Sequence, residues 1–152
     1  MLFKKDYPTV SVAEISLKKD YAFMYGNCIV SSQQKLFLVL EQADGLIDTL
    51  QFDFSIYKYG YPNDEVSHPL SKYGLGSYGL FQVTNSPWVT ELRDNNRQHH
   101  RHTDNSFDGY KHYVARFKDV TVEVICTSMK EIQLAKSELF VFLDEQIKYL
   151  TK

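Results

Sequence analysis

Leu50-Gln51-Phe52-Asp53-Phe54-Ser55-Ile56 alternates apolar and polar residues without a break. Successive side chains of a strand point to opposite faces, so this pattern is typical of a strand with one buried and one polar face. The earlier run Lys35–Leu40 is apolar on both faces, as in a central strand covered on both sides. Asp44-Gly45 lies between the two runs and is a hairpin-type turn signal. The sequence therefore predicts two strands here, joined by a tight turn.

Further strands are expected on both sides of this pair. They are an edge strand at Val10–Leu17, a strand bent at Gly26-Asn27 within Tyr21–Ser31, a strand at Tyr78–Thr84, and a hairpin formed by Tyr110–Phe117 and Val120–Thr127 around Lys118-Asp119. With a two-residue turn, one face of the hairpin carries His112, Val114, Arg116, Thr121, Glu123 and Ile125. Glu123 is then near Arg116, and we expect a cross-strand ion pair.

Two helices are predicted. Ser86 has the features of an N-cap, with Pro87 at the first helical position, and this short helix ends near Asn95-Asn96. Ser128-Met129-Lys130-Glu131 has the pattern of a capping box that opens the last helix. Its apolar stripe is expected to cover the sheet: Ile132, Ala135, Leu139, Leu143, Ile147 and Leu150. The predicted fold is a single α+β domain over residues 1–152, with a mainly antiparallel sheet, a short central helix and a long C-terminal helix packed on one face.

Bulk composition limits the classes of partner. The chain has 152 residues and a formal net charge of −2, which argues against a dedicated nucleic-acid binder. The start of the chain turns polar at once and no apolar run approaches membrane-spanning length, so we expect a cytoplasmic protein without a membrane partner. Cys28 and Cys126 both lie in apolar runs and are expected to be buried structural thiols. The chain has 11 Tyr and 10 Phe, and this high aromatic content favours a protein with a binding surface.

The middle of the chain differs from the rest, because all five histidines lie between residues 57 and 112. Gly60–Gly79 has no sustained periodicity, and an irregular stretch of this length in a compact domain is commonly functional. Several aromatic and apolar residues within it favour an ordered loop. We therefore expect a functional surface on the middle of the chain.

The segment with His99, His100, Arg101 and His102 has two functional interpretations. Imidazoles are common transition-metal ligands, and His112, Asp64 or Glu65 are among the residues that can complete such a set. Alternatively, Arg97, Arg101 and the histidines bind an anion, since arginine forks pair with carboxylate or phosphate. The competing structural interpretation is a solvated loop that nearby aspartates neutralise. No metal motif of known spacing is present, so neither a metal nor a cofactor is assigned.

The segment Asn63-Asp64-Glu65 is first of all a turn, because Asn and Asp bond their own backbone. Paired carboxylates beside His68 are also suited to general acid–base work. No serine nucleophile elbow, phosphate loop or zincin signature is present. Both interpretations of this turn stay open.

At these landmarks the chain resembles a group of short bacterial proteins without an assigned activity. The shared pattern runs G-Y-P-N-D-E, H-P-L, N-S-x-W with E-L, H-x-R-H, H-Y and F-x-D-x-T-x-E, and it matches here at residues 60–65, 68–70, 85–88 with 91–92, 99–102, 112–113 and 117–123. Lys118 stands where the pattern often has a histidine. The resemblance implies a shared polar site over about the middle half of the chain, and it brings no chemistry with it.

Three functional hypotheses follow. The first is a polar cleft that binds a small anionic ligand or a polar protein segment, lined by Tyr59, Asn63, Asp64, Glu65, His68, Arg101, His102 and His112. The second is a non-enzymatic inhibitor or immunity-type protein whose tyrosine-rich surface binds a partner protein. The third is a metal-assisted hydrolase with His99 or His100, His102 and His112 as ligands and Asp64 or Glu65 as base.

One geometric prediction tests the first and third hypotheses. If the middle of the chain builds one site, the side chains of His68, His102 and His112 converge within about 8 Å of one another, with Asp64 or Glu65 nearby.

Overall fold

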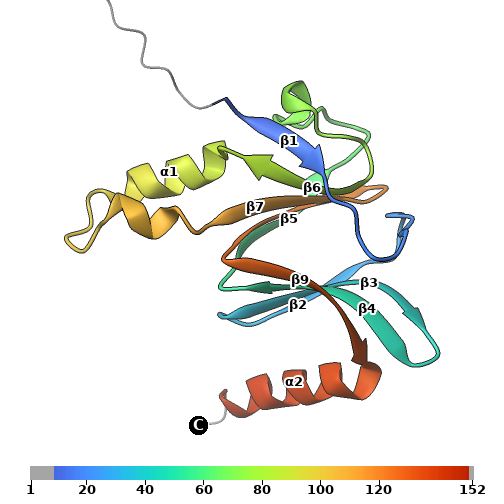
Figure 1. The fold of residues 1–152 in the computed structure, drawn as a ribbon. Coiled ribbons are helices and arrows are strands. Elements are labelled where there is room, and N and C mark those ends of the chain that lie inside the picture. The colour runs from blue at the N-terminus through green and yellow to red at the C-terminus, as the bar shows by residue number, and fades with distance from the viewer. Residues whose placement is uncertain (1–8, 151–152) are drawn as a thin grey trace, which may run out of the picture.

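A computed structural model of the chain describes residues 9–150, which form two antiparallel sheets and two helices (Figure 1). Sheet A has the strand order β1-β6-β7-β8-β5 and sheet B the order β2-β3-β4-β9. The strands of sheet A are β1 (Ser11–Glu14), β5 (Ile56–Pro62), β6 (Gly79–Thr84), β7 (Lys111–Arg116) and β8 (Val120–Cys126). The strands of sheet B are β2 (Cys28–Ser31), β3 (Lys35–Ala43), β4 (Leu46–Asp53) and β9 (Ser128–Ala135). The predicted α+β class with a mainly antiparallel sheet is confirmed.

The helices are α1 (Pro87–Asn96) and α2 (Lys136–Lys148), and single 3-10 turns lie at η1 (Ser71–Tyr73) and η2 (Asp104–Phe107). Ser86 caps α1, because its Oγ accepts the Val89 N–H at 3.2 Å, and Pro87 occupies the first turn. The predicted start and end of the short helix are thus confirmed. Within residues 9–150, no helix is long and apolar enough to cross a membrane.

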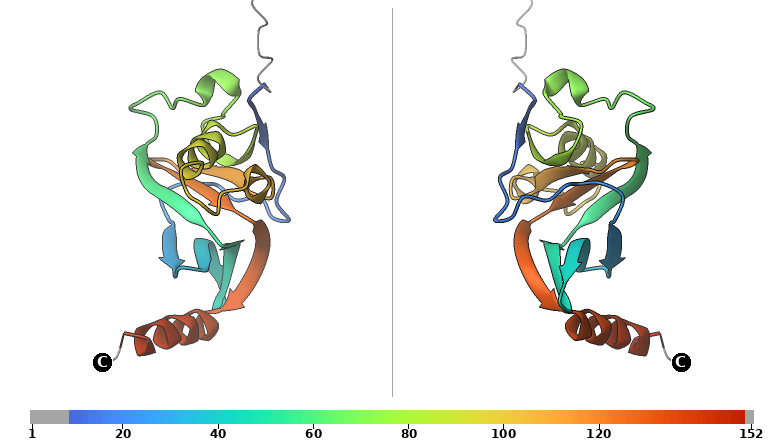
Figure 2. Two further views of the ribbon diagram at one scale, coloured as in Figure 1. Left: turned by 90° about the vertical axis from the view of Figure 1, so that its left-hand side faces the viewer. Right: turned by 90° about the vertical axis from the view of Figure 1, so that its right-hand side faces the viewer.

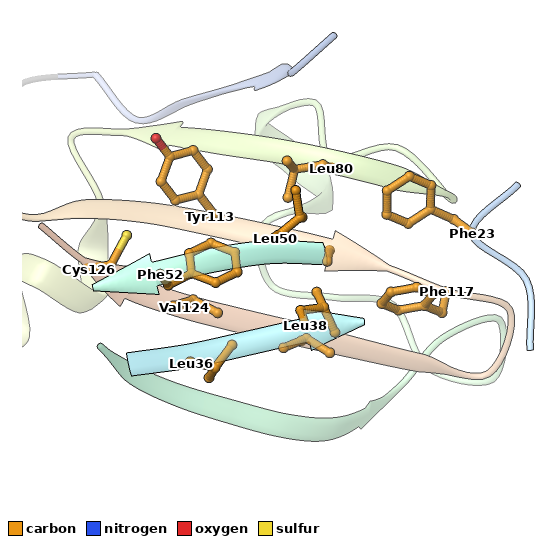
Figure 3. Packing of buried hydrophobic residues seen from close by; sticks show 12 residues of the cluster. Phe23, Leu36, Leu38, Leu50, Phe52, Leu80, Tyr113, Phe117, Val124 and Cys126 are labelled. Carbon is orange, nitrogen blue, oxygen red and sulfur yellow. The ribbon is translucent and has the colours of Figure 1, made fainter. Parts of the chain in front are cut away.

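One core lies between the inner faces of the two sheets (Figure 3). β3 and β4 direct Leu36, Leu38, Leu50 and Phe52 toward sheet A, and all four are fully buried. The opposing residues come from β6, β7 and β8 and include Leu80, Tyr113, Ala115, Val122, Val124 and Cys126. Burying these side chains supplies the main favourable free energy of folding.

The predicted tight turn between β3 and β4 is confirmed. Asp44 and Gly45 have φ values of 54° and 78°, the left-handed conformation that a two-residue hairpin needs and that Asp-Gly tolerates. β3 pairs with β2 on one side and β4 on the other, so it is the central strand that its two apolar faces predicted. The β7–β8 hairpin has the predicted register too, with Ala115 opposite Val122 and His112 opposite Ile125.

The single strand predicted at 50–56 is wrong in its second half. β4 ends at Asp53, Phe54 takes a φ of 50°, and Ile56 begins β5 in the other sheet. Phe54 and Ile56 are 62% and 46% exposed, whereas Leu50 and Phe52 are buried. Alternation continues in the sequence because both strands have the same period, so it does not reveal that the chain crosses between sheets.

The capping box predicted at Ser128 is also wrong. Residues 128–135 form β9, which pairs with β4 from Asp53 to Leu46, and the Ser128 hydroxyl donates to the Asp53 carboxylate at 2.9 Å. The helix begins eight residues later, where the Glu138 carboxylate accepts the Ala135 N–H at 3.2 Å. The edge of β4 needs a partner strand, and this tertiary requirement overrides the local cap pattern.

Helix α2 packs on the outer face of sheet B, at the end of the molecule away from sheet A (Figures 1 and 2). Phe142 meets buried Phe37 edge-to-face with ring centroids 4.9 Å apart. The helix is therefore on one face of the sheet as predicted. Its apolar stripe is covered only in part, since Leu143 and Ile147 are exposed.

Smaller differences concern the N-terminal half and the central loop. The edge strand predicted at Val10–Leu17 is confirmed in shorter form as β1, while only Cys28–Ser31 of the strand predicted at Tyr21–Ser31 forms. β5 extends through Pro62, so the irregular loop starts later than predicted. Cys126 is buried as expected, but Cys28 is exposed because it lies on the edge strand β2.

The outer face of sheet A is covered by the loop 63–78 and by α1. Leu70 and Leu75 of the loop pack on Phe81, Val83 and Val114 of β6 and β7 and form a second, smaller apolar cluster. Beside this cluster the hairpin β7–β8 carries polar side chains beneath the loop. These side chains make the candidate site.

Candidate functional site: a buried polar layer on sheet A

Glu123 joins two histidines that are far apart in the sequence. Its Oε1 lies 3.0 Å from His112 Nε2 and its Oε2 lies 3.2 Å from His68 Nε2. His112 is two positions from Glu123 in the β7–β8 register, whereas His68 comes from the loop. Both histidines are buried, and the Glu123 side chain is 12% exposed. The predicted ion pair between Arg116 and Glu123 is wrong: the carboxylate bonds the histidines instead.

The backbone fixes the tautomer of His68. The Leu70 N–H donates to His68 Nδ1 at 3.0 Å, so Nδ1 has no proton and Nε2 carries it. Nε2 then donates to the Glu123 carboxylate. His68 therefore ties the start of the segment 68–75 to β8.

His112 continues the chain of hydrogen bonds toward α1. A carboxylate only accepts, so His112 Nε2 carries the proton, and in the neutral imidazole Nδ1 then accepts from the Ser86 hydroxyl at 2.7 Å. Ser86 Oγ in turn accepts the Val89 N–H. If both imidazoles are neutral and Glu123 is ionised, each imidazole nitrogen, the Ser86 hydroxyl and both Glu123 oxygens have a hydrogen-bond partner.

The electrostatics agree with an ionised Glu123. Burial alone raises the pKa of this carboxyl, but hydrogen bonds from His112 and His68 outweigh it and lower the pKa to about 2. At neutral pH a negative charge therefore lies between the two histidines. An anion is not expected to bind directly between the two histidines.

Aromatic side chains enclose both imidazoles. Trp88 meets His112 edge-to-face with centroids 5.5 Å apart, and Tyr61 meets His68 at 5.0 Å. Lys58 of β5 places its ammonium 4.0 Å from the Trp88 ring centroid. The polar row is thus packed inside protein.

Asn63 holds the opposite end of the loop. Its amide nitrogen donates to the carbonyl oxygens of Ser77 and Phe117, each at 2.7 Å. Its Oδ1 accepts from the Arg116 guanidinium and from the Asp64 N–H. Asn63 is fully buried, so the turn interpretation of the segment 63–65 is the one that the contacts favour.

The other residues expected in the cleft lie elsewhere. Asp64 bonds Lys118 at 3.1 Å and Tyr78 at 3.0 Å at the surface, and Glu65 is exposed. Tyr59 extends toward β2, where its hydroxyl donates to Asn27 at 2.7 Å. None of these three forms a hydrogen bond with the two buried histidines.

Arg101 and His102 form a separate group beyond the end of α1. His102 Nε2 bonds Asp104 at 2.5 Å, and Asp104 is paired twice by Arg97. These contacts lower the pKa of Asp104 to about 2, with the Arg97 hydrogen bond as the largest cause. Arg101 is exposed and its N–H donates to His99. The segment thus matches the self-neutralised loop that competed with the anion interpretation.

The predicted convergence is met only in part, and the carboxylate between the histidines is Glu123 and not Asp64 or Glu65. His68 and His112 share Glu123, whereas His102 is held by Asp104 and Phe107. Over residues 9–150, no group of three His, Cys, Asp or Glu side chains is arranged to hold a metal ion. The ligand set of the metal-assisted hydrolase is therefore not assembled.

Ser86, His112 and Glu123 have the connectivity of a hydrolase triad. However, Ser86 Oγ is the cap of α1, and Pro87 directly after it has no N–H to donate to an oxyanion. The hydrogen bonds among Ser86, His112, Glu123 and His68 therefore serve best to hold α1, sheet A and the loop together.

Sequence reasoning missed Glu123, Ser86 and Arg116 as members of this layer. A signal was present, because the hairpin register placed His112, Arg116 and Glu123 on one face. It did not reveal which element covers that face. Neither a scan of protein-family models nor searches of curated proteins and solved structures found a match to this chain. The ligand-binding role of the eight residues and the resemblance to short bacterial proteins stay predictions.

Proposed function

We propose that the protein acts by binding a partner protein, as inhibitors and immunity proteins do, and that the partner docks along strand β5. The observation that carries the proposal is a row of exposed large side chains on and just before this strand. Phe54, Ile56, Tyr57 and Tyr59 are 62%, 46%, 41% and 51% exposed. We call these four residues the aromatic edge. Tyrosine and phenylalanine are enriched in the binding surfaces of proteins.

The backbone of β5 supports the same proposal. β5 ends sheet A and pairs only with β8, and among residues 9–150 the stretch 56–59 makes no other backbone hydrogen bond. Strand β5 lies at the edge of sheet A in both views of Figure 2. An open edge of this kind accepts an added strand from another chain.

Two tyrosines of the aromatic edge are held in fixed positions. The Tyr57 hydroxyl lies 3.0 Å from Ser31 Oγ, and Tyr59 donates to Asn27. A side chain that is already ordered loses less conformational entropy when a partner covers it. The rings are therefore preorganised for contact.

The first hypothesis, a histidine-lined cleft, has less support. His68 and His112 are buried and their ring nitrogens are already bonded. The large side chains that are exposed and open to a partner lie on and just before β5 instead.

The occupant that fits best is an extended, neutral or acidic segment of another protein. Lys58 is the only charged residue of β5, so the strand is basic. A second copy of this chain fits less well. Antiparallel pairing of two β5 strands in the symmetric register centred on Lys58 sets two Lys58 side chains directly opposite each other, which is unfavourable.

The test is a selection of displayed random peptides of about 12 residues against the wild-type protein. Enriched peptides are then measured against Tyr59→Ala and Ile56→Lys. The matched control is Tyr149→Ala, which removes a still more exposed tyrosine from the other end of the molecule. We expect losses of at least about tenfold for both β5 variants and none for the control, since tyrosines at the centre of a binding surface are enriched among hot spots and a lysine at position 56 places a charge in the contact.

Three results contradict the proposal. They are peptides that bind all four proteins equally, a library that yields no binder, and a wild-type protein whose measured mass in solution is that of a dimer that Ile56→Lys dissociates. The last result favours a second copy as the occupant.

A further inference from the structure

Arg116 is a buried cation whose hydrogen-bonding capacity is mostly unused. It ends β7 on the outer face of sheet A and is 5% exposed. A guanidinium has five N–H donors in a planar fork. Among the described residues it donates one hydrogen bond, to Asn63, and its Nε is buried without an acceptor.

No carboxylate of residues 9–150 pairs with Arg116. Asp64 and Glu123 are close enough to act on it electrostatically, but each already has its own partners. Asp64 bonds Lys118 and Tyr78, and Glu123 bonds the two histidines. Buried charges in proteins are ordinarily paired, so a lone guanidinium at this depth indicates a missing acceptor.

The surroundings hold the fork in place. Asn63 receives its hydrogen bond from Arg116 and is itself fixed by donations to two backbone carbonyl groups. The loop that begins at Asn63 is exposed at residues 64–67, and it includes Asn63-Asp64-Glu65, the turn singled out in the sequence. The position is therefore preorganised and has an exposed loop next to it.

We propose that Arg116 binds a carboxylate group beneath the loop 63–68. A carboxylate matches the planar fork with two parallel hydrogen bonds. Phosphate fits less well, because its second charge is repelled by Asp64 and Glu123. The carboxylate comes either from a small free acid or from an acidic side chain or C-terminus of a polypeptide. This site does not depend on the aromatic edge.

The experiment observes the Nε–H signals of the arginines in ¹H–¹⁵N spectra at pH 6.5 and constant ionic strength. Arg116→Lys keeps the charge but loses the fork, and it identifies the Arg116 signal. Arg97→Lys is the matched control, because Arg97 is exposed and already paired with Asp94 and Asp104. The probes are sodium acetate, sodium phosphate, and one short peptide with either a free or an amidated C-terminus.

We expect a saturable shift of the Arg116 signal with acetate, on the order of 1–10 mM in dissociation constant, and none of the Arg97 signal. Saturation by acetate assigns a free acid as a ligand, whereas saturation only by the free-carboxyl peptide assigns a polypeptide carboxylate. No saturable shift with any carboxylate overturns the proposal, as does a shift with phosphate alone. Where Arg116→Lys fails to fold, Lys substitutions of the other three arginines, Arg93, Arg97 and Arg101, assign the Arg116 signal by elimination, and the wild-type titration still decides. Tyr59→Ala must leave the shift of the Arg116 signal unchanged. Failure of the partner-docking proposal can therefore be told apart from failure of the carboxylate proposal.

Discussion

Glu123 Oε2 lies 3.2 Å from His68 Nε2, although 55 residues separate the two in the sequence. The bond joins the covering loop to the middle of β8. His112 and Ser86 extend the same row to the first turn of α1. Stability of the loop, the hairpin and the short helix therefore depends on one carboxylate.

Replacement of Glu123 by Gln is expected to lower the free energy of unfolding by about 2–3 kcal/mol. The amide is neutral, so two hydrogen bonds to an ionised acceptor lose their charge assistance, and one NH₂ faces an imidazole N–H. Urea unfolding measures the effect. Glu65→Gln, on the exposed part of the same loop, is the control and should change stability by less than about 0.5 kcal/mol. Equal effects of the two substitutions would show that the bridge contributes nothing.

The same carboxylate predicts an acid dependence. The folded pKa of Glu123 is about 2, below the ordinary value of 4.5, so folding favours the ionised form. Its contribution is fully present above about pH 4.5 and is lost as the pH falls toward about 2. The difference in stability between wild type and Glu123→Gln should therefore shrink as the pH falls from about 4.5 toward about 2. A difference that grows on acidification contradicts this assignment.

Ser86→Ala is expected to cost about 1–2 kcal/mol, because it removes the cap of α1 and the donor to His112 Nδ1 together. Ser67→Ala, at an exposed loop position, provides the matched control. Urea unfolding and helix content by circular dichroism are the measurements. A Ser86→Ala protein as stable as wild type would mean that water replaces both bonds.

Phe142→Ala should destabilise the packing of α2 by about 1–2 kcal/mol, less than a fully buried Phe, since the side chain is only half-buried against Phe37. Phe140→Ala, two residues earlier and 59% exposed, should be nearly neutral. Amide hydrogen exchange of α2 reads out local detachment. Similar exchange in both variants would indicate that the Phe37 contact does not hold the helix.

The two cysteines should react differently with a thiol reagent. Cys126 is fully buried, and burial raises the pKa of its thiol to about 12, so it should react only on unfolding. Cys28 is exposed on β2 and should react in the folded protein. A stopped-flow assay should thus count one fast thiol, and Cys28→Ser should remove it. Two fast thiols would contradict the buried position of Cys126.

The sequence by itself determined those features that depend on neighbours along the chain. Asp44-Gly45 specified a left-handed turn, Ser86-Pro87 specified a helix start, and Lys118-Asp119 set the register that puts His112 and Glu123 on one face. Each rests on local sterics and hydrogen bonding within a few residues.

Only the tertiary structure decided the features that depend on distant segments. The alternation through Ile56 did not reveal the crossing to sheet A at Phe54. The segment after Ser128 has a helix-cap pattern but forms strand β9, because it pairs with the edge of β4. The candidate site shows the same division. The sequence identified His68, His112 and Asn63, but Glu123 joins the histidines, and Asn63 meets Arg116, only after the loop folds over the hairpin. The physical reason is that local patterns record each residue's preferred face, whereas burial and pairing depend on which distant surface covers that face.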